Sequence, residues 1–247
     1  GFHRDGKQSM HELDLKALGV TGINQKLYAI PKDTNERHWV IKNPMGQHAI
    51  ACGVDAPLTI DIMGHVGFYC GGMNKEAEIT IHGHAGVGIA ENIMSGVVWV
   101  KGNASESAGA TGNGGLLVIE GDASSRCGIS MKGIDIVVGG SVGHMSAFMA
   151  QRGNLVVCGD AGEALGDSIY EARLYVRGKV SDLGADCHQT GRLPLRDDAC
   201  EQIHRGEQDE GGKAKAQRRD QHDPACRLPL GRDVAPQGTH HAGHRLH

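Results

Sequence analysis

The first chemistry to consider is phosphate binding by the stretch ITIHGHAGVG, where Gly83, Gly86 and Gly88 follow a strand-like run. Glycines at such spacing let backbone amides approach a phosphate closely. A P-loop, however, ends in Gly-Lys-Ser/Thr, and a dinucleotide-binding loop opens a helix; neither pattern follows Gly88. We therefore predict that these glycines serve the fold, and we assign no cofactor-binding residue.

Histidines are the second group of candidates, at His65, His82, His84 and His144. Imidazoles on neighbouring turns of a repeat can bind a metal or transfer protons. His65 and His84 are nineteen residues apart, and Asn103 follows at the same interval. We favour a two-rung polar ladder of His65 and His84 over a metal site, and we assign no metal ligand.

Aspartates could provide a carboxylate pair at Asp122, Asp160 and Asp167. The first two share the repeat position of Asn103, where short polar side chains commonly satisfy backbone donors in turns. No Ser–His–Asp or Cys–His arrangement is legible in the sequence. We therefore assign no catalytic residue and expect no active site within this chain.

The cysteines are odd in number, seven, and form no C-x-x-C pair. This spacing lacks the signature of a zinc ribbon, of a ferredoxin-type cluster or of a secreted disulfide framework. We expect reduced, mostly buried thiols in a soluble cytoplasmic protein, because neither a signal peptide nor a transmembrane-length apolar run is present. The seven are Cys52, Cys70, Cys127, Cys158, Cys187, Cys200 and Cys226.

Charge and composition narrow the function further. The chain has 247 residues and 38 glycines, but only 3 Phe, 2 Trp and 4 Tyr. Residues 57–187 carry 8 Lys/Arg against 14 Asp/Glu. This acidic segment lacks the basic stripe that a nucleic-acid-binding surface needs, so we expect no nucleic-acid partner.

A nineteen-residue repeat organises the middle of the chain. Aliphatic residues stand two and four positions before each repeat glycine, and Val or Ala stands two positions after it. Nineteen residues are too few for helical repeats and suit one turn of a parallel β-solenoid. No proline occurs between Pro57 and Pro194, as expected where every strand donates hydrogen bonds on both sides. The repeat glycines are Gly64, Gly83, Gly102, Gly121, Gly140, Gly159 and Gly178.

The pattern predicts an all-β, single-stranded parallel β-helix of about seven coils, with Val138 among the inward residues. We divide the chain into a lead-in or cap (1–37), the β-helix domain (38–187) and a tail (188–247). Within the flanks, HELDLKAL (His11–Leu18) predicts a short helix, HWVIKN a strand and NPMG a turn. The tail is poor in apolar residues and rich in Arg, His and Pro, so we expect disorder there.

Methionines recur in the second half of the repeats, where adaptable side chains serve either as packing or as a partner interface. We favour an interface for some of them, since a chain without reactive residues must act through contacts. The methionines concerned are Met73, Met94, Met131, Met145 and Met149.

Six consecutive segments carry a family resemblance: GHVGFYCGGMN, GHAGVGIAENIMSG, GNASESAGATGNGG, GDASSRCGISMKG, GGSVGHMSAFMAQRG and GDAGEALGDSIYEA. Together they closely resemble the GXGXG domain, the C-terminal β-helix of the glutamate synthase large subunit, which also occurs as a separate subunit. The resemblance covers about residues 38–187. It is strongest to the stand-alone subunit of complexes such as N-methylglutamate synthase (methylamine–glutamate N-methyltransferase), although the tail departs from that pattern.

The resemblance implies a right-handed parallel β-helix that acts as a non-catalytic structural subunit. In such complexes the helix braces a glutamine-amidotransferase-like subunit against an FMN-binding synthase subunit. FMN and the iron–sulfur cluster would then belong to the synthase partner, with no cofactor in this chain and no membrane contact.

Two alternatives remain. One is the related β-helix subunit of formylmethanofuran dehydrogenase. The other is a hexapeptide-type acyltransferase, whose apolar residues recur every six positions; nineteen is not a multiple of six.

Overall fold

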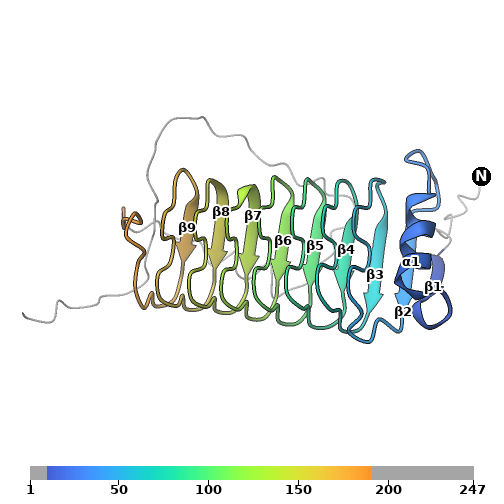
Figure 1. The fold of residues 1–247 in the computed structure, drawn as a ribbon, viewed down its shortest axis with the longest axis horizontal. Coiled ribbons are helices and arrows are strands. Elements are labelled where there is room, and N and C mark those ends of the chain that lie inside the picture. The colour runs from blue at the N-terminus through green and yellow to red at the C-terminus, as the bar shows by residue number, and fades with distance from the viewer. Residues whose placement is uncertain (1–9, 191–247) are drawn as a thin grey trace, which may run out of the picture.

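The chain winds into an elongated solenoid whose strands stack side by side along one axis (Figure 1). The structure, a computed structural model, describes residues 10–190. Its strands form one nine-stranded sheet in chain order, with every neighbouring pair parallel. The strands are β1 (Met10–Asp14), β2 (His38–Lys42), β3 (Thr59–Met63), β4 (Glu78–Ile81), β5 (Val97–Val100), β6 (Leu116–Ile119), β7 (Lys132–Val138), β8 (Arg152–Val157) and β9 (Arg173–Val176).

The predicted parallel β-helix of about seven coils is confirmed. From β3 onward, paired residues of adjacent strands are nineteen positions apart, as in Thr59 with Glu78 and Asn154 with Arg173, except that Lys132 pairs with Arg152 before a register shift in β7. The residues two and four positions before each repeat glycine all point inward. None of these side chains is more than 1% exposed. They are Ile60, Ile62, Ile79, Ile81, Val98, Val100, Leu117, Ile119, Ile136, Val138, Leu155, Val157, Leu174 and Val176.

The small residues after the repeat glycines form a second stacked column. Isolated parallel bridges join Val66 to Ala85 and Ala85 to Ala104, and the column resumes from Val142. The glycines just before these positions allow the coils to approach closely. A Cβ on Gly83 would lie 2.7 Å from the carbonyl carbon of Gly64, a separation that real Cβ atoms essentially never show.

The bend that closes each coil has a backbone that the sequence did not reveal. Residues with positive φ recur there at every second position, as at Tyr69 (59°), Gly71 (64°) and Met73 (54°). The same three positions repeat in later coils, for example at Met145 (54°) and Met149 (53°). Residues other than glycine are strained at such positive φ values. Stacking between coils must therefore hold these bends in place.

The lead-in differs from its prediction. We expected a helix over His11–Leu18, but residues up to Asp14 form β1, which pairs with β2 and extends the sheet. The helix α1 (Leu15–Tyr28) begins where Asp14 caps it by accepting a hydrogen bond from the Lys16 N–H at 2.9 Å. Pairing with β2 overrides the local helical pattern of the first four residues. The strand predicted for HWVIKN and the turn predicted for NPMG are both confirmed.

Helix α1 closes the N-terminal end of the coil stack (Figure 1). Its residues Leu15, Ile23 and Leu27 are buried in the common core. The Asn24 amide imitates a neighbouring strand, because it donates to the Ala49 carbonyl at 2.8 Å and accepts from the Ala51 N–H at 2.9 Å. One carbonyl and one N–H at the open edge of the first coil are thereby satisfied by a side chain.

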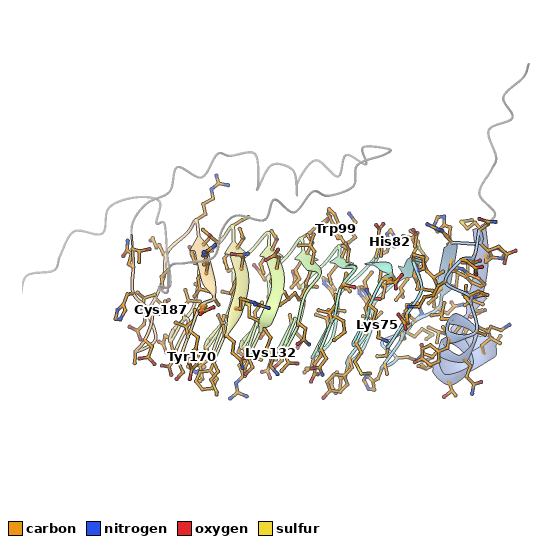
Figure 2. The ribbon with its side chains drawn as sticks, turned by 90° about the horizontal axis from the view of Figure 1, so that it is seen from above. Lys75, His82, Trp99, Lys132, Tyr170 and Cys187 are labelled. Atoms are coloured by element: carbon orange, nitrogen blue, oxygen red, sulfur yellow. The ribbon has the colours of Figure 1, made fainter. Side chains whose placement is uncertain are left out.

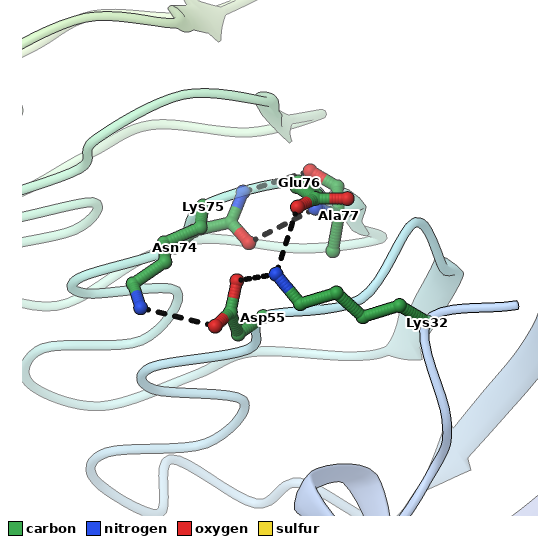
Figure 3. A network of polar contacts seen from close by, with 6 residues as sticks. All are labelled: Lys32, Asp55, Asn74, Lys75, Glu76 and Ala77. Carbon is green, nitrogen blue, oxygen red and sulfur yellow. Dashed lines mark hydrogen bonds and ion pairs between the residues drawn. The ribbon is translucent and has the colours of Figure 1, made fainter.

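Ion pairs fasten the segment after α1 to the first two coils (Figure 3). The Lys32 ammonium lies 2.8 Å from an Asp55 oxygen and 3.1 Å from a Glu76 oxygen, and Lys75 contacts the other Asp55 oxygen at 3.0 Å. Beside them, the buried Asn74 side chain exchanges hydrogen bonds with the Ala77 backbone. The exposed pairs each contribute little stability, but together they fix the path of the lead-in.

Residues 1–9 and 191–247 lie outside the described part of the chain, and with them nearly all of the tail for which we expected disorder.

Replacing Val138 by Asp tests the inward column. Val138 is fully buried between Ile119 and Val157, so an unpaired carboxylate there should lower the free energy of unfolding by about 3 kcal/mol or more. Urea unfolding followed by circular dichroism measures the effect. Val137→Asp, on the outward side of the same strand, is the control and should cost clearly less; equal costs would contradict the assignment of faces.

Candidate functional site

The polar residues predicted to form a ladder do so, and the ladder is longer than expected. Along the ladder, a side chain accepts a hydrogen bond from the backbone N–H of the equivalent residue in the next coil. The donor–acceptor pairs are His84 N to His65 Nδ1 (2.9 Å), Asn103 N to His84 Nδ1 (2.9 Å), Asp122 N to Asn103 Oδ1 (3.0 Å), Ser141 N to Asp122 Oδ1 (2.7 Å), Asp160 N to Ser141 Oγ (2.9 Å) and Lys179 N to Asp160 Oδ1 (2.7 Å). The ladder stops at Lys179, since an ammonium group cannot accept a hydrogen bond.

This ladder accounts for the two histidines that suggested a metal site. The rings of His65 and His84 stack with centroids 4.9 Å apart and planes 7° from parallel. Each Nδ1 already accepts a backbone N–H, and parallel rings do not converge on one point. The remaining polar candidates are separate: His144 is exposed on a bend, and Asp167 accepts a hydrogen bond from the Ala185 N–H at 3.2 Å.

A carboxylate held between two imidazoles lies on the outward face of the sheet. Asp61 of β3 contacts His38 Nε2 of β2 at 2.7 Å and His82 Nε2, just after β4, at 2.6 Å. Burial acts to raise the pKa of Asp61, but the hydrogen bonds from His82 and His38 outweigh it and hold the pKa below its ordinary value of 3.8. This contact joins three successive strands.

His82 was among the predicted candidates, whereas His38 and Asp61 were not. Their signal was present in the register, because His38 and His82 lie two positions to either side of Asp61 in neighbouring strands. That register could be read only once the 21-residue step from β2 to β3 was known.

Neither the glycines at 83, 86 and 88 nor the cysteines of residues 10–190 form a reactive site. Gly83 and Gly86 are positions of close coil approach, and Gly88 has a positive φ of 69°. Cys52, Cys70 and Cys127 are free thiols, and burial raises the pKa of Cys127 to about 12. Within residues 10–190, no group of three or more His, Cys, Asp or Glu side chains could hold a metal ion.

Exposed apolar side chains are the remaining candidates for function. Met131 is buried and Met145 half-buried, whereas Met73, Met94 and Met149 are exposed. The structure thus divides the methionines between core and surface. Figure 2 shows His82 and Trp99 along one long side of the solenoid, and Lys75, Lys132 and Tyr170 along the opposite side.

The chain is similar to Protein GlxC of Rhizobium meliloti (strain 1021). The two are 58% identical over 83 residues, which is 34% of this chain and 36% of that protein. The match thus spans about a third of the length of the curated relative. No family model matches the chain, and no solved structure matches it. Across residues 10–190, no helix has the length and apolarity needed to cross a bilayer.

Replacing Asn103 by Ala tests the ladder. The Asp122 N–H loses its acceptor, which should lower the free energy of unfolding by about 0.5–1.5 kcal/mol. Asn103→Ser is the control, because serine supplies the acceptor at Ser141 in the same column. Guanidinium unfolding compares the variants; no difference between Ala and Ser would mean that the side-chain acceptor is not needed.

Acid titration of stability tests the Asp61 contact. Because the pKa of Asp61 is lower in the folded chain, its contribution is complete above the unfolded value near 3.8 and is lost as the pH falls through the folded value. Between about pH 4 and pH 2, the urea midpoint of the wild type should therefore fall more steeply than that of Asp61→Asn. Parallel curves for the two proteins would show that Asp61 contributes no pH-dependent stability.

Proposed function

We propose that this chain is a non-catalytic structural subunit of a glutamate-synthase-type complex. In this proposal it braces a glutamine-amidotransferase-like subunit against an FMN-binding synthase subunit, in an assembly such as N-methylglutamate synthase. FMN and the iron–sulfur cluster are then held by the synthase partner, and the complex operates in the cytoplasm.

The observation that carries the proposal is the use made of the polar side chains. In the ladder, a histidine, asparagine, aspartate or serine side chain accepts a hydrogen bond from a backbone N–H of the next coil, and Asp61 contacts two imidazoles. These polar side chains therefore stabilise the contact between neighbouring coils. The GXGXG-like segments support the choice of a glutamate-synthase-type complex.

The shape suits a brace. Nine stacked strands at about 4.8 Å per step give a rod on the order of 40 Å long. Along the rod, backbone N–H groups donate to backbone carbonyls and to ladder side chains of adjacent coils, so bending the rod would break many hydrogen bonds at once. A rod of this kind can hold two larger subunits at a constant separation.

Co-production with the two proposed partners tests the assignment. The isolated chain should show no turnover of glutamine, or of glutamate with methylamine, and it should co-elute with the two partners in size-exclusion chromatography. Omitting the chain should uncouple glutamine hydrolysis from product formation by the partners. Turnover by the isolated chain would overturn the structural role, and absence of any complex would overturn the choice of partners.

A further inference from the structure

An exposed aromatic patch lies on the first coils, made by Tyr28, Phe68 and Tyr69 with Met73 and the carboxylate of Glu91. We propose that this patch docks a basic surface of a partner subunit, with an arginine or lysine seated against Tyr69 and Glu91 and apolar side chains around it. The inference rests on the proposed function, because it names the surface through which the subunit makes contact.

The patch gathers large apolar side chains that the fold leaves in solvent. Tyr28 is 56% exposed, Phe68 45%, Tyr69 47% and Met73 53%. These residues come from α1 and from the second coil, yet they meet on one surface. The Tyr28 hydroxyl donates to the Cys52 carbonyl at 2.7 Å, and the Cys52 thiol donates to the Tyr69 carbonyl at 2.7 Å.

The rings are held rigidly. Phe68 stacks on His48 with centroids 4.4 Å apart, and its N–H donates to His48 Nδ1 at 2.8 Å. Tyr69 meets Phe68 edge-on at 6.3 Å. Rigid aromatic side chains lose little conformational entropy on binding, which is why they dominate the energetics of protein interfaces.

The backbone conformation at Tyr69 is one that disfavours bulky side chains. Its φ is 59°, whereas the equivalent residue in the next coil is Gly88. A Cβ on Gly88 would lie 2.6 Å from the Tyr69 ring, so the ring lies across that glycine. The fold would tolerate a smaller residue at 69 better, since asparagine accepts positive φ more readily than tyrosine. The backbone conformation at this position therefore does not account for the tyrosine.

Charge decides what kind of partner fits. A Cβ on Gly88 would also lie 3.0 Å from Glu91 Oε2, which places this carboxylate beside the Tyr69 ring. Glu91 and the neighbouring Glu106 form no ion pair and no side-chain hydrogen bond within residues 10–190. By contrast, Lys75 is already paired with Asp55.

An aromatic face beside an unpaired carboxylate attracts a cation twice, through the ring quadrupole and through the opposite charge. Arginine fits best, because its planar guanidinium stacks on the ring while its N–H groups reach the carboxylate. The surrounding Phe68, Tyr28 and Met73 then cover the apolar part of the partner surface. A partner with an acidic surface would be repelled by Glu91 and Glu106.

Two variants test the proposal in the complex with the amidotransferase-like and synthase subunits. Tyr69→Asn removes the ring and leaves stability unchanged or improved, and Glu91→Lys reverses the charge. Each should weaken binding by about tenfold or more, measured by surface plasmon resonance on the purified chain. Added salt should weaken binding of the wild type more than binding of Glu91→Lys.

Met145→Asn is the matched control, since Met145 holds the same position in a coil further along, with a φ of 54°. It should bind like the wild type. Failure of the wild-type chain to assemble with either subunit overturns the proposed function. Normal assembly of the wild type together with unchanged binding of Tyr69→Asn and Glu91→Lys overturns the docking surface alone.

Discussion

The hydrogen bonds between equivalent residues of successive coils are the interaction on which the whole molecule depends. A nineteen-residue step places like residues above one another, so backbone N–H groups find acceptors in the adjacent coils. The same step aligns aliphatic side chains into buried columns such as Ile119, Val138 and Val157. Hydrophobic burial and hydrogen bonding thus have the same periodicity, and neither is satisfied by one coil alone.

This constraint also governs what the polar residues can do. At each ladder position, the side chain that could react also caps a neighbouring backbone N–H, as His84 does for Asn103. Freeing such a group for catalysis would leave a donor without its partner. On the sheet face, Asp61 similarly joins three strands through its two imidazole contacts. The stacking of coils therefore favours a binding surface on this fold over a reactive pocket.

The two ends of the described stack differ in chemistry. At the N-terminal end, α1 covers the core, and Asn24 replaces a missing backbone neighbour. The aromatic patch lies next to this cap, and it includes Tyr28 from α1 itself. At the other end, the side-chain ladder runs out at Lys179. The cap thus has two roles, because it closes the core and completes the surface through which we propose the chain binds.

The sequence by itself determined the fold class and the buried columns, because a repeat of fixed length fixes which residues align, whatever the details of the bends. It also indicated the polar ladder, since His65, His84 and Asn103 share one position. Only the tertiary structure decided that residues His11–Asp14 form a strand, because pairing with β2 outweighs a local helical pattern. It alone brought His38 to Asp61, and Tyr28 to Tyr69, because these contacts join segments outside the regular nineteen-residue step. Backbone conformations such as the positive φ of Tyr69 were likewise hidden, because they arise from the stacking of whole coils and not from the residue that adopts them.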